Sequence, residues 1–170
     1  PDYDAFWSDQ AVDKLLAAQP LKVPVMLVHS LWDPEDIYGA LAVYRALKGK
    51  DGSGQMLKLV MGPWHHGQEI DEGSSLGALH FGSDTSNYFR QQILRPYLAQ
   101  YLKDGAPKAN IAPVTAYETG ANRWQRLDRW PLACADGCAT KSRNLYLQPG
   151  HHVGCDAPAG AASNAAAYDE

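Results

Sequence analysis

The chain has 170 residues, of which 45% are hydrophobic and 20% are charged, and its formal net charge is −4 at pH 7. This length corresponds to about one ordinary domain, and the composition excludes an intrinsically disordered or collagen-like protein. The acidic balance leaves no basic stripe for a nucleic-acid backbone, and no apolar run approaches the ~20 residues that cross a bilayer. We therefore expect a folded protein that binds neither nucleic acid nor membrane.

Apolar periodicity predicts a strand–helix–strand unit near the start of the chain. A helical pattern covers 8–19, with Ser8 as its N-cap. Short apolar runs at 23–29 and 56–61 are typical of strands buried on both faces, and a helix at 36–47 lies between them. This order predicts a right-handed crossover and a parallel sheet.

The second half of the chain changes character. A long helix is predicted over 83–103, with a kink at Pro96. Beyond it, turn residues separate two short predicted strands, at 113–118 and 144–147. We therefore expect an α/β domain over 1–108 and the start of an all-β domain over 109–170. Because Pro1 cannot be a translation start and the chain ends in an alanine-rich stretch, we also expect a piece of a larger protein.

The three cysteines leave two interpretations open. Cys134 and Cys138 are spaced closely enough for a tight disulfide with Cys155 left over, and three unrelated thiols are equally compatible with the sequence. A zinc site would need more ligands at suitable spacing than these cysteines and the pair His151-His152 provide. We therefore expect no metal and no cofactor.

Polar residues follow both predicted parallel strands, and functional groups gather at such strand ends in open α/β sheets. The first strand leads to Asp33, which Pro34 keeps extended, and the second leads to His65 and His66. A carboxylate beside a histidine is what the base of a serine nucleophile needs, because it fixes the imidazole tautomer and stabilises the imidazolium. A purely structural role for Asp33 is an equally good interpretation of its position.

Four segments together resemble one enzyme family. They are Ser-Leu-Trp-Asp-Pro-Glu-Asp-Ile-Tyr-Gly at 30–39, Gly-Pro-Trp-His-His-Gly at 62–67, Gly-Ser-Asp at 82–84 and Thr-Gly-Ala-Asn-Arg-Trp at 119–124. The chain resembles the α-amino acid ester hydrolases, relatives of the cocaine esterase and glutaryl acylase group. The resemblance implies the C-terminal part of a parallel α/β-hydrolase sheet, followed by the beginning of a jelly-roll β-sandwich.

The resemblance also implies roles for individual residues. Asp33 would be the acid and His66 the histidine of a Ser-His-Asp triad, with His65 serving packing or hydrogen bonding; an exchange of the two histidines is the alternative. Glu35 and Asp36 match acids that hold the α-ammonium group of a small-molecule substrate, although two acids at a helix start also favour its dipole.

The serine of the triad is not expected within this chain. Gly73-Ser74-Ser75-Leu76-Gly77 matches Gly-x-Ser-x-Gly, but no buried strand precedes it, and the serine of this fold comes before the acid and the histidine. We therefore reject Ser75 as the nucleophile. The serine and its oxyanion-hole donors are expected upstream of Pro1, and the isolated segment is expected to be inactive.

The implied function is a serine hydrolase that cleaves or transfers the acyl group of α-amino acid esters and amides, including β-lactam antibiotics. One alternative is a related X-prolyl dipeptidyl peptidase or glutaryl acylase. Another, from a different class, is a noncatalytic carbohydrate-binding or assembly module. The resemblance further implies a homo-oligomer that is periplasmic or secreted.

Overall fold

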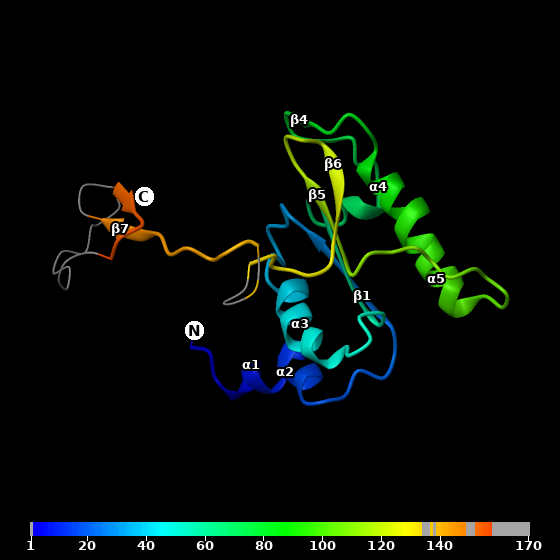
Figure 1. Cartoon of the computed structure of the whole chain (residues 1–170), viewed down its shortest axis with the longest axis horizontal. Coiled ribbons are helices and arrows are strands. Elements are labelled where there is room, and N and C mark those ends of the chain that lie inside the picture. Colours follow the sequence, from blue (N-terminus) through cyan, green and yellow to red (C-terminus); the bar gives the residue numbers. More distant parts are fainter. Residues whose placement is uncertain (1, 134–136, 138, 149–151, 158–170) are drawn as a thin grey trace. The chain divides into compact units, whose positions relative to one another are not determined.

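Figure 1 shows the computed structural model, which describes residues 2–133, 137, 139–148 and 152–157. The chain divides into two compact units, Pro1–Trp130 and Pro131–Glu170. Within the described residues of the second unit, β7 (Tyr146–Gln148) and β8 (His152–Gly154) form an antiparallel pair. No helix in the described part of the chain is both long and apolar enough to cross a membrane.

A four-stranded sheet forms the centre of the first unit, with the strand order β1-β2-β5-β6. The strands are β1 (Val25–Ser30), β2 (Leu57–Gly62), β5 (Val114–Glu118) and β6 (Arg123–Leu127). β1 and β5 are parallel to β2, and β6 is antiparallel to β5. The helix α3 (Gly39–Leu47) connects β1 to β2. The predicted strand–helix–strand unit with parallel pairing is therefore confirmed.

The side chains of β2 alternate between two apolar clusters, one on each face of the sheet. Leu59 and Met61 pack in the cluster that includes side chains of α3. Val60 packs in the other cluster, with Trp64 and Phe89. In Figure 1, α3 (cyan) and the segment from α4 to α5 (green) lie on different sides of the sheet. Because both faces are covered, all six residues of β2 are buried.

The long helix predicted over 83–103 is present, with a change of helical type inside it. It consists of α4 (Thr85–Tyr88), the π-helical turn η3 (Phe89–Leu94) and α5 (Arg95–Leu102). Asp84 caps its start by accepting a hydrogen bond from the Asn87 N–H at 2.8 Å. Pro96 has no N–H to donate, and the hydrogen-bond spacing widens to the π type immediately before it.

The predicted helix starts at residues 8 and 36 are both wrong. The segment predicted as one helix over 8–19 forms α1 (Ala5–Asp9) and α2 (Val12–Ala17) instead. The N-cap of α1 is Asp4 rather than Ser8, because the Asp4 carboxylate accepts a hydrogen bond from the Phe6 N–H at 3.0 Å. Ala11, with an extended backbone, separates the two helices.

The helix expected from residue 36 begins at Gly39 as α3. The Asp33 carboxylate accepts hydrogen bonds from the N–H groups of Glu35 and Asp36, which holds these two residues in a turn before the helix. Sequence periodicity extends through this turn and therefore does not reveal it. β1, expected to be buried on both faces, is only half-buried over 25–28, because it forms an edge of the sheet within the described residues.

The expected domain boundary at residue 108 does not coincide with the division of the structure, which follows Trp130. The segment at 113–118 was expected to begin an all-β domain, but it forms β5 of the central sheet. The Leu59 N–H donates a hydrogen bond to the Pro113 carbonyl at 3.0 Å, and Val114 is fully buried. β5 therefore belongs to the α/β core. The boundary was inferred from short strands separated by turn residues, and such a pattern does not identify a partner strand.

The remaining elements are short. They are the 3-10 turns η1 (Lys48–Lys50) and η2 (Gln68–Ile70) and the two-residue strands β3 (Ser75–Leu76) and β4 (Leu79–His80). Cys134 and Cys138 lie outside the described residues, as does His151, so the disulfide between the two cysteines and the alternative of unrelated thiols both stay predictions. Cys155 is an exposed free thiol.

Candidate functional site

The ends of the two parallel strands lie side by side, and the contact continues into the loops that follow. Ser30 is paired with Gly62 at the end of the sheet. Beyond it, the Leu31 N–H donates to the Gly62 carbonyl at 2.9 Å, and the Trp32 N–H donates to the Trp64 carbonyl at 3.0 Å. The loop that carries Asp33 is thereby fastened to the loop that carries the two histidines.

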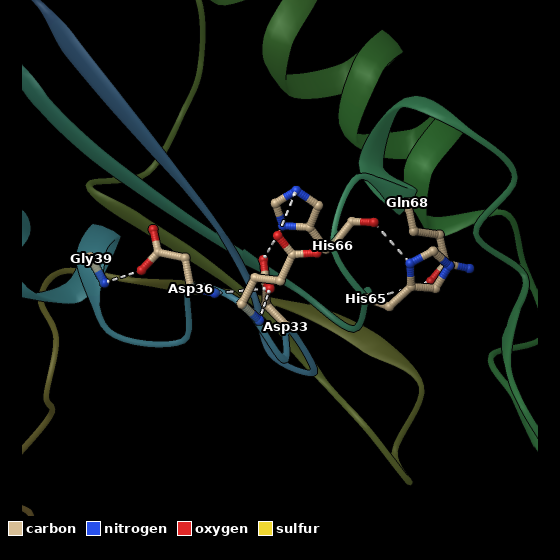
Figure 2. A network of polar contacts seen from close by, with 7 residues as sticks. Asp33, Asp36, Gly39, His65, His66 and Gln68 are labelled. Carbon is tan, nitrogen blue, oxygen red and sulfur yellow. Dashed lines mark hydrogen bonds and ion pairs between the residues drawn. The ribbon is translucent and has the colours of Figure 1, made fainter.

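Asp33 and His66 form a hydrogen-bonded pair across these loops (Figure 2). His66 Nδ1 lies 3.0 Å from Asp33 Oδ2. The other oxygen, Oδ1, accepts hydrogen bonds from the N–H groups of Glu35 and Asp36, at 2.8 Å and 3.0 Å. The side chain of Asp33 is 10% exposed and that of His66 is 56% exposed. The carboxylate is thus fixed by its own turn and presents one oxygen to the imidazole.

The electrostatics of the pair favour a charged acid and a basic histidine. Hydrogen bonds from the N–H groups of Asp36 and Glu35, together with the His66 ring, hold the pKa of Asp33 below its usual value despite desolvation. The hydrogen bond to Asp33 raises the pKa of His66, and the negative charges of Glu35 and Asp33 add to this effect. An ionised carboxylate can only accept, so Nδ1 of His66 carries the proton and Nε2 of the neutral ring is the basic atom.

The two acids that follow Asp33 lie in different places. Glu35 is exposed, and its Oε2 lies 4.0 Å from His66 Nε2. Asp36 turns toward the start of α3, where its Oδ1 accepts a hydrogen bond from the Gly39 N–H at 2.6 Å (Figure 2). A Cβ at Gly39 would lie 2.6 Å from Asp36 Oδ2, so any larger residue there would require the Asp36 carboxylate to shift. The structure therefore brings Glu35 to the histidine and holds Asp36 beside α3.

His65 does not contact Asp33. It is exposed, and its Nδ1 lies 2.9 Å from the carbonyl oxygen of His66. Its backbone N–H donates to Gln68 Oε1 at 3.3 Å, and Figure 2 shows it beside Gln68, away from Asp33. Of the two neighbouring histidines, the structure therefore places His66 beside Asp33, as the resemblance implied. Among the described residues, His65 forms hydrogen bonds only with Gln68 and with the backbone of His66. The catalytic roles themselves stay predictions.

The loop that carries His66 is anchored in the core by Trp64. This side chain is fully buried, and its Nε1–H donates to Thr85 Oγ1 at 2.9 Å. The Thr85 hydroxyl in turn donates to the Gly73 carbonyl at 2.7 Å. A Cβ at Gly62 would lie 2.3 Å from the Trp64 ring, which explains the glycine of Gly-Pro-Trp. Trp64 is thus a core residue, whereas Trp32 and Tyr38 are exposed within the described structure.

A cavity of about 160 Å³ adjoins the pair. Its polar lining consists of His29, Ser30, Asp33, Asp36, His66 and Glu69. His29 is buried, but its Nδ1 has no hydrogen-bond partner among the described residues. Burial lowers the pKa of His29, so its ring is neutral near pH 7. Glu69 was missed, because nothing in its sequence context distinguishes it from other loop acids.

Ser75 lies in a setting unlike that of a catalytic serine. It begins β3, which pairs with β4 in an antiparallel hairpin. Its carbonyl oxygen accepts a hydrogen bond from Gln68 Nε2 at 2.8 Å. A nucleophile elbow requires a sharp turn from a strand into a helix, and Ser75 has no such surroundings.

Comparison with known proteins shows which proteins this chain is similar to. Residues 1–68 match the family model described as X-Pro dipeptidyl-peptidase (S15 family). The chain is similar to the structure of a selenomethionine-labelled α-amino acid ester hydrolase, with a TM-score of 0.85 and 50% identity, over 92% of this chain and 26% of that one. It is also similar to an aminopeptidase from the marine sediment archaeon Thaumarchaeota archaeon, with a TM-score of 0.81 and 44% identity, over 95% of this chain and 25% of that one.

None of the curated protein sequences gives a significant match to this chain. The chain spans about a quarter of the length of the two solved structures. The match to the family model covers residues 1–68, which include both Asp33 and His66. The expected α/β fold is confirmed, and the chain belongs, as a segment, to the family of the α-amino acid ester hydrolases.

Proposed function

We propose that this chain supplies the acid and the base of a serine hydrolase whose substrates carry a free α-ammonium group. The observation that carries the proposal is the hydrogen bond between Asp33 and His66, which leaves Nε2 of the histidine as the basic atom. The likeness to an ester hydrolase and to an aminopeptidase supports hydrolysis of an acyl bond. The nucleophilic serine would come from a part of the protein outside this chain.

The proposed chemistry follows the general logic of the Ser-His-Asp triad. His66 Nε2 takes the proton of the serine hydroxyl while the serine oxygen bonds to the acyl carbon. The imidazolium then gives this proton to the leaving alcohol or amine, and an acyl-enzyme remains. Water, or an amine acceptor such as a β-lactam nucleus, is deprotonated by His66 and attacks the acyl carbon. The bond between the acyl carbon and the serine oxygen then breaks, and the imidazolium returns the proton to this oxygen. Asp33 stays ionised throughout and stabilises the imidazolium.

Glu35 and Asp36 support the preference for an α-ammonium group. Both lie within three residues of Asp33, and Glu35 Oε2 lies 4.0 Å from His66 Nε2, the atom that would take the proton of the serine. A carboxylate near this position attracts an ammonium group in the ground state and in the transition state alike, so its contribution is mainly to KM. A free amine beside the acyl carbon is common to an α-amino acid ester and to the amino-terminal residue that an aminopeptidase releases.

The second candidate is a peptidase, favoured by the match of residues 1–68 to the dipeptidyl-peptidase family model and by the aminopeptidase neighbour. The two activities differ in the leaving group. Turnover of phenylalanine methyl ester and phenylalanine p-nitroanilide by the full-length protein separates them. Turnover of the ester without turnover of the anilide supports the ester hydrolase, and turnover of the anilide supports the peptidase.

The α-ammonium preference is tested with a matched ester that lacks the amine, methyl 3-phenylpropionate. The double variant Glu35→Gln, Asp36→Asn should lower kcat/KM for the amino ester roughly 10- to 100-fold, the range for hydrogen bonds to charged groups, mostly through KM. Turnover of the des-amino ester should change little. If kcat/KM falls equally for both esters, the two acids serve to stabilise the start of α3 and not to bind the ammonium group. Absence of turnover, with binding of a glycan, would favour the noncatalytic module.

A further inference from the structure

The cavity beside Asp33 contains two buried polar atoms that have no partner among the described residues, Nδ1 of His29 and Oε2 of Glu69. His29 is only 3% exposed. A buried polar atom without a hydrogen bond destabilises a protein by the cost of its lost hydration. Two such atoms around one cavity indicate that an occupant supplies the missing contacts.

The segment that carries Glu69 is held in place by contacts from the long helix. Arg90 Nη1 donates to the Glu69 carbonyl at 2.9 Å and to the Asp71 carbonyl at 2.7 Å. The Ser86 hydroxyl donates to the Gln68 carbonyl at 2.8 Å. The backbone at Glu69 is therefore fixed before any ligand arrives, as binding with little loss of entropy requires.

The charges around the cavity select a cation. Three carboxylates line it, those of Asp33, Asp36 and Glu69. Both oxygens of Asp33 are engaged by the turn and by His66, and Oδ1 of Asp36 accepts a hydrogen bond from the Gly39 N–H. Oδ2 of Asp36 and the carboxylate of Glu69 are therefore left for an occupant. Neutral His29 adds an uncharged acceptor when its proton is on Nε2. An ammonium group has three N–H donors and a positive charge, which matches these three acceptors.

The size of the cavity agrees with such an occupant. A water molecule takes about 30 Å³ in the liquid, so a cavity of about 160 Å³ holds an ammonium group and the carbon next to it. We propose that Glu69 and His29 complete, with Asp36, the ammonium site of the substrate, and that Glu69 is a specificity-determining residue. This inference rests on the proposed function and adds two residues to it.

The test uses the full-length protein and the same two esters, with and without the α-amine. Glu69→Gln removes the charge and keeps the size of the side chain. Glu72→Gln is the matched control, since Glu72 lies in the same loop, is exposed and accepts a hydrogen bond from the Ser74 N–H at 2.9 Å. A second variant, His29→Leu, removes the buried acceptor and leaves an apolar side chain that suits a buried site.

We expect Glu69→Gln to lower kcat/KM for the amino ester roughly 10- to 100-fold through KM, and to leave the des-amino ester unchanged. His29→Leu should also lower kcat/KM for the amino ester. Glu72→Gln should leave kcat/KM for both esters unchanged. Circular dichroism and urea unfolding would show that each variant is folded.

Three results would overturn the inference, and they are distinguishable from failure of the proposed function. If Glu69→Gln lowers kcat/KM equally for the amino ester and the des-amino ester, Glu69 acts through the charge of His66. If kcat/KM for the amino ester is unchanged in Glu69→Gln, the cavity holds water only. The proposed function would still stand if kcat/KM for the amino ester falls in the Glu35, Asp36 double variant. A wild-type protein without preference for the amino ester would overturn both.

Discussion

Replacing Asp33 by asparagine isolates the contribution of the carboxylate to the histidine. In the wild type, Oδ1 accepts two backbone hydrogen bonds, from the N–H groups of Glu35 and Asp36, and Oδ2 faces His66. An asparagine side chain has one acceptor oxygen and one donor NH₂ group. With its oxygen in the place of Oδ1, both backbone bonds are kept. The reverse orientation would set the NH₂ group against two N–H donors, so the first orientation is preferred.

In this orientation the amide of the variant donates toward His66 Nδ1, which lies 3.0 Å from Oδ2 in the wild type. The imidazole must then accept at Nδ1 and carry its proton on Nε2, where it cannot remove a proton from serine. We expect kcat for an amino ester to fall by about 10⁴, the loss measured when the acid of such a triad becomes an amide. The fold should remain, because the turn before α3 keeps its hydrogen bonds.

The assay is steady-state hydrolysis of phenylalanine methyl ester by the full-length Asp33→Asn protein, with urea unfolding as the check on folding. The pKa of His66, followed by nuclear magnetic resonance, should fall toward its ordinary value because the negative charge is lost. A loss of activity below about tenfold in a folded variant would refute the reasoning, since catalysis would then not depend on the tautomer of His66.

Three further predictions concern neighbouring residues. His65→Ala should keep kcat/KM close to the wild-type value, because its contacts are to the adjacent backbone; a loss comparable with that of His66→Ala would reverse the roles of the histidines. Since the charge of Glu35 helps to raise the pKa of His66, the active neutral ring forms only at higher pH, and Glu35→Gln should shift the rise of kcat/KM to lower pH; an unmoved profile contradicts this. Thr85→Val should lower the free energy of unfolding in urea by about 1–3 kcal/mol, because the buried Nε1–H of Trp64 loses its acceptor, whereas unchanged stability would show that the bond contributes nothing.

The parallel part of the fold could be predicted because its pattern is local. β1 and β2 were expected at 23–29 and 56–61 and lie at Val25–Ser30 and Leu57–Gly62, since each is a continuous apolar run with turn residues at its end. The proximity of Asp33 and His66 follows from the same pattern, because the carboxyl ends of neighbouring parallel strands share one edge of the sheet.

The features that sequence analysis missed depend on contacts between distant segments. The place of β5 in the sheet is set by its pairing with β2, and a short strand bounded by turn residues does not specify its partner. The burial of Glu69 Oε2 depends on the turn η2, which Arg90 and Ser86 hold from the long helix. A residue's spacing along the chain contains no information about such contacts, so an acid in an irregular loop resembles any solvated acid.

The central claim is that His66, oriented by Asp33, activates a serine. Labelling of the full-length protein with a fluorophosphonate, which reacts with activated serines, tests it most directly when the modified residue is identified by peptide mapping. We predict rapid labelling of a single serine other than Ser75 in the wild type and in His65→Ala, and loss of this labelling in His66→Ala. Labelling of His66→Ala at the wild-type rate, or a wild-type protein that does not react, would contradict the account.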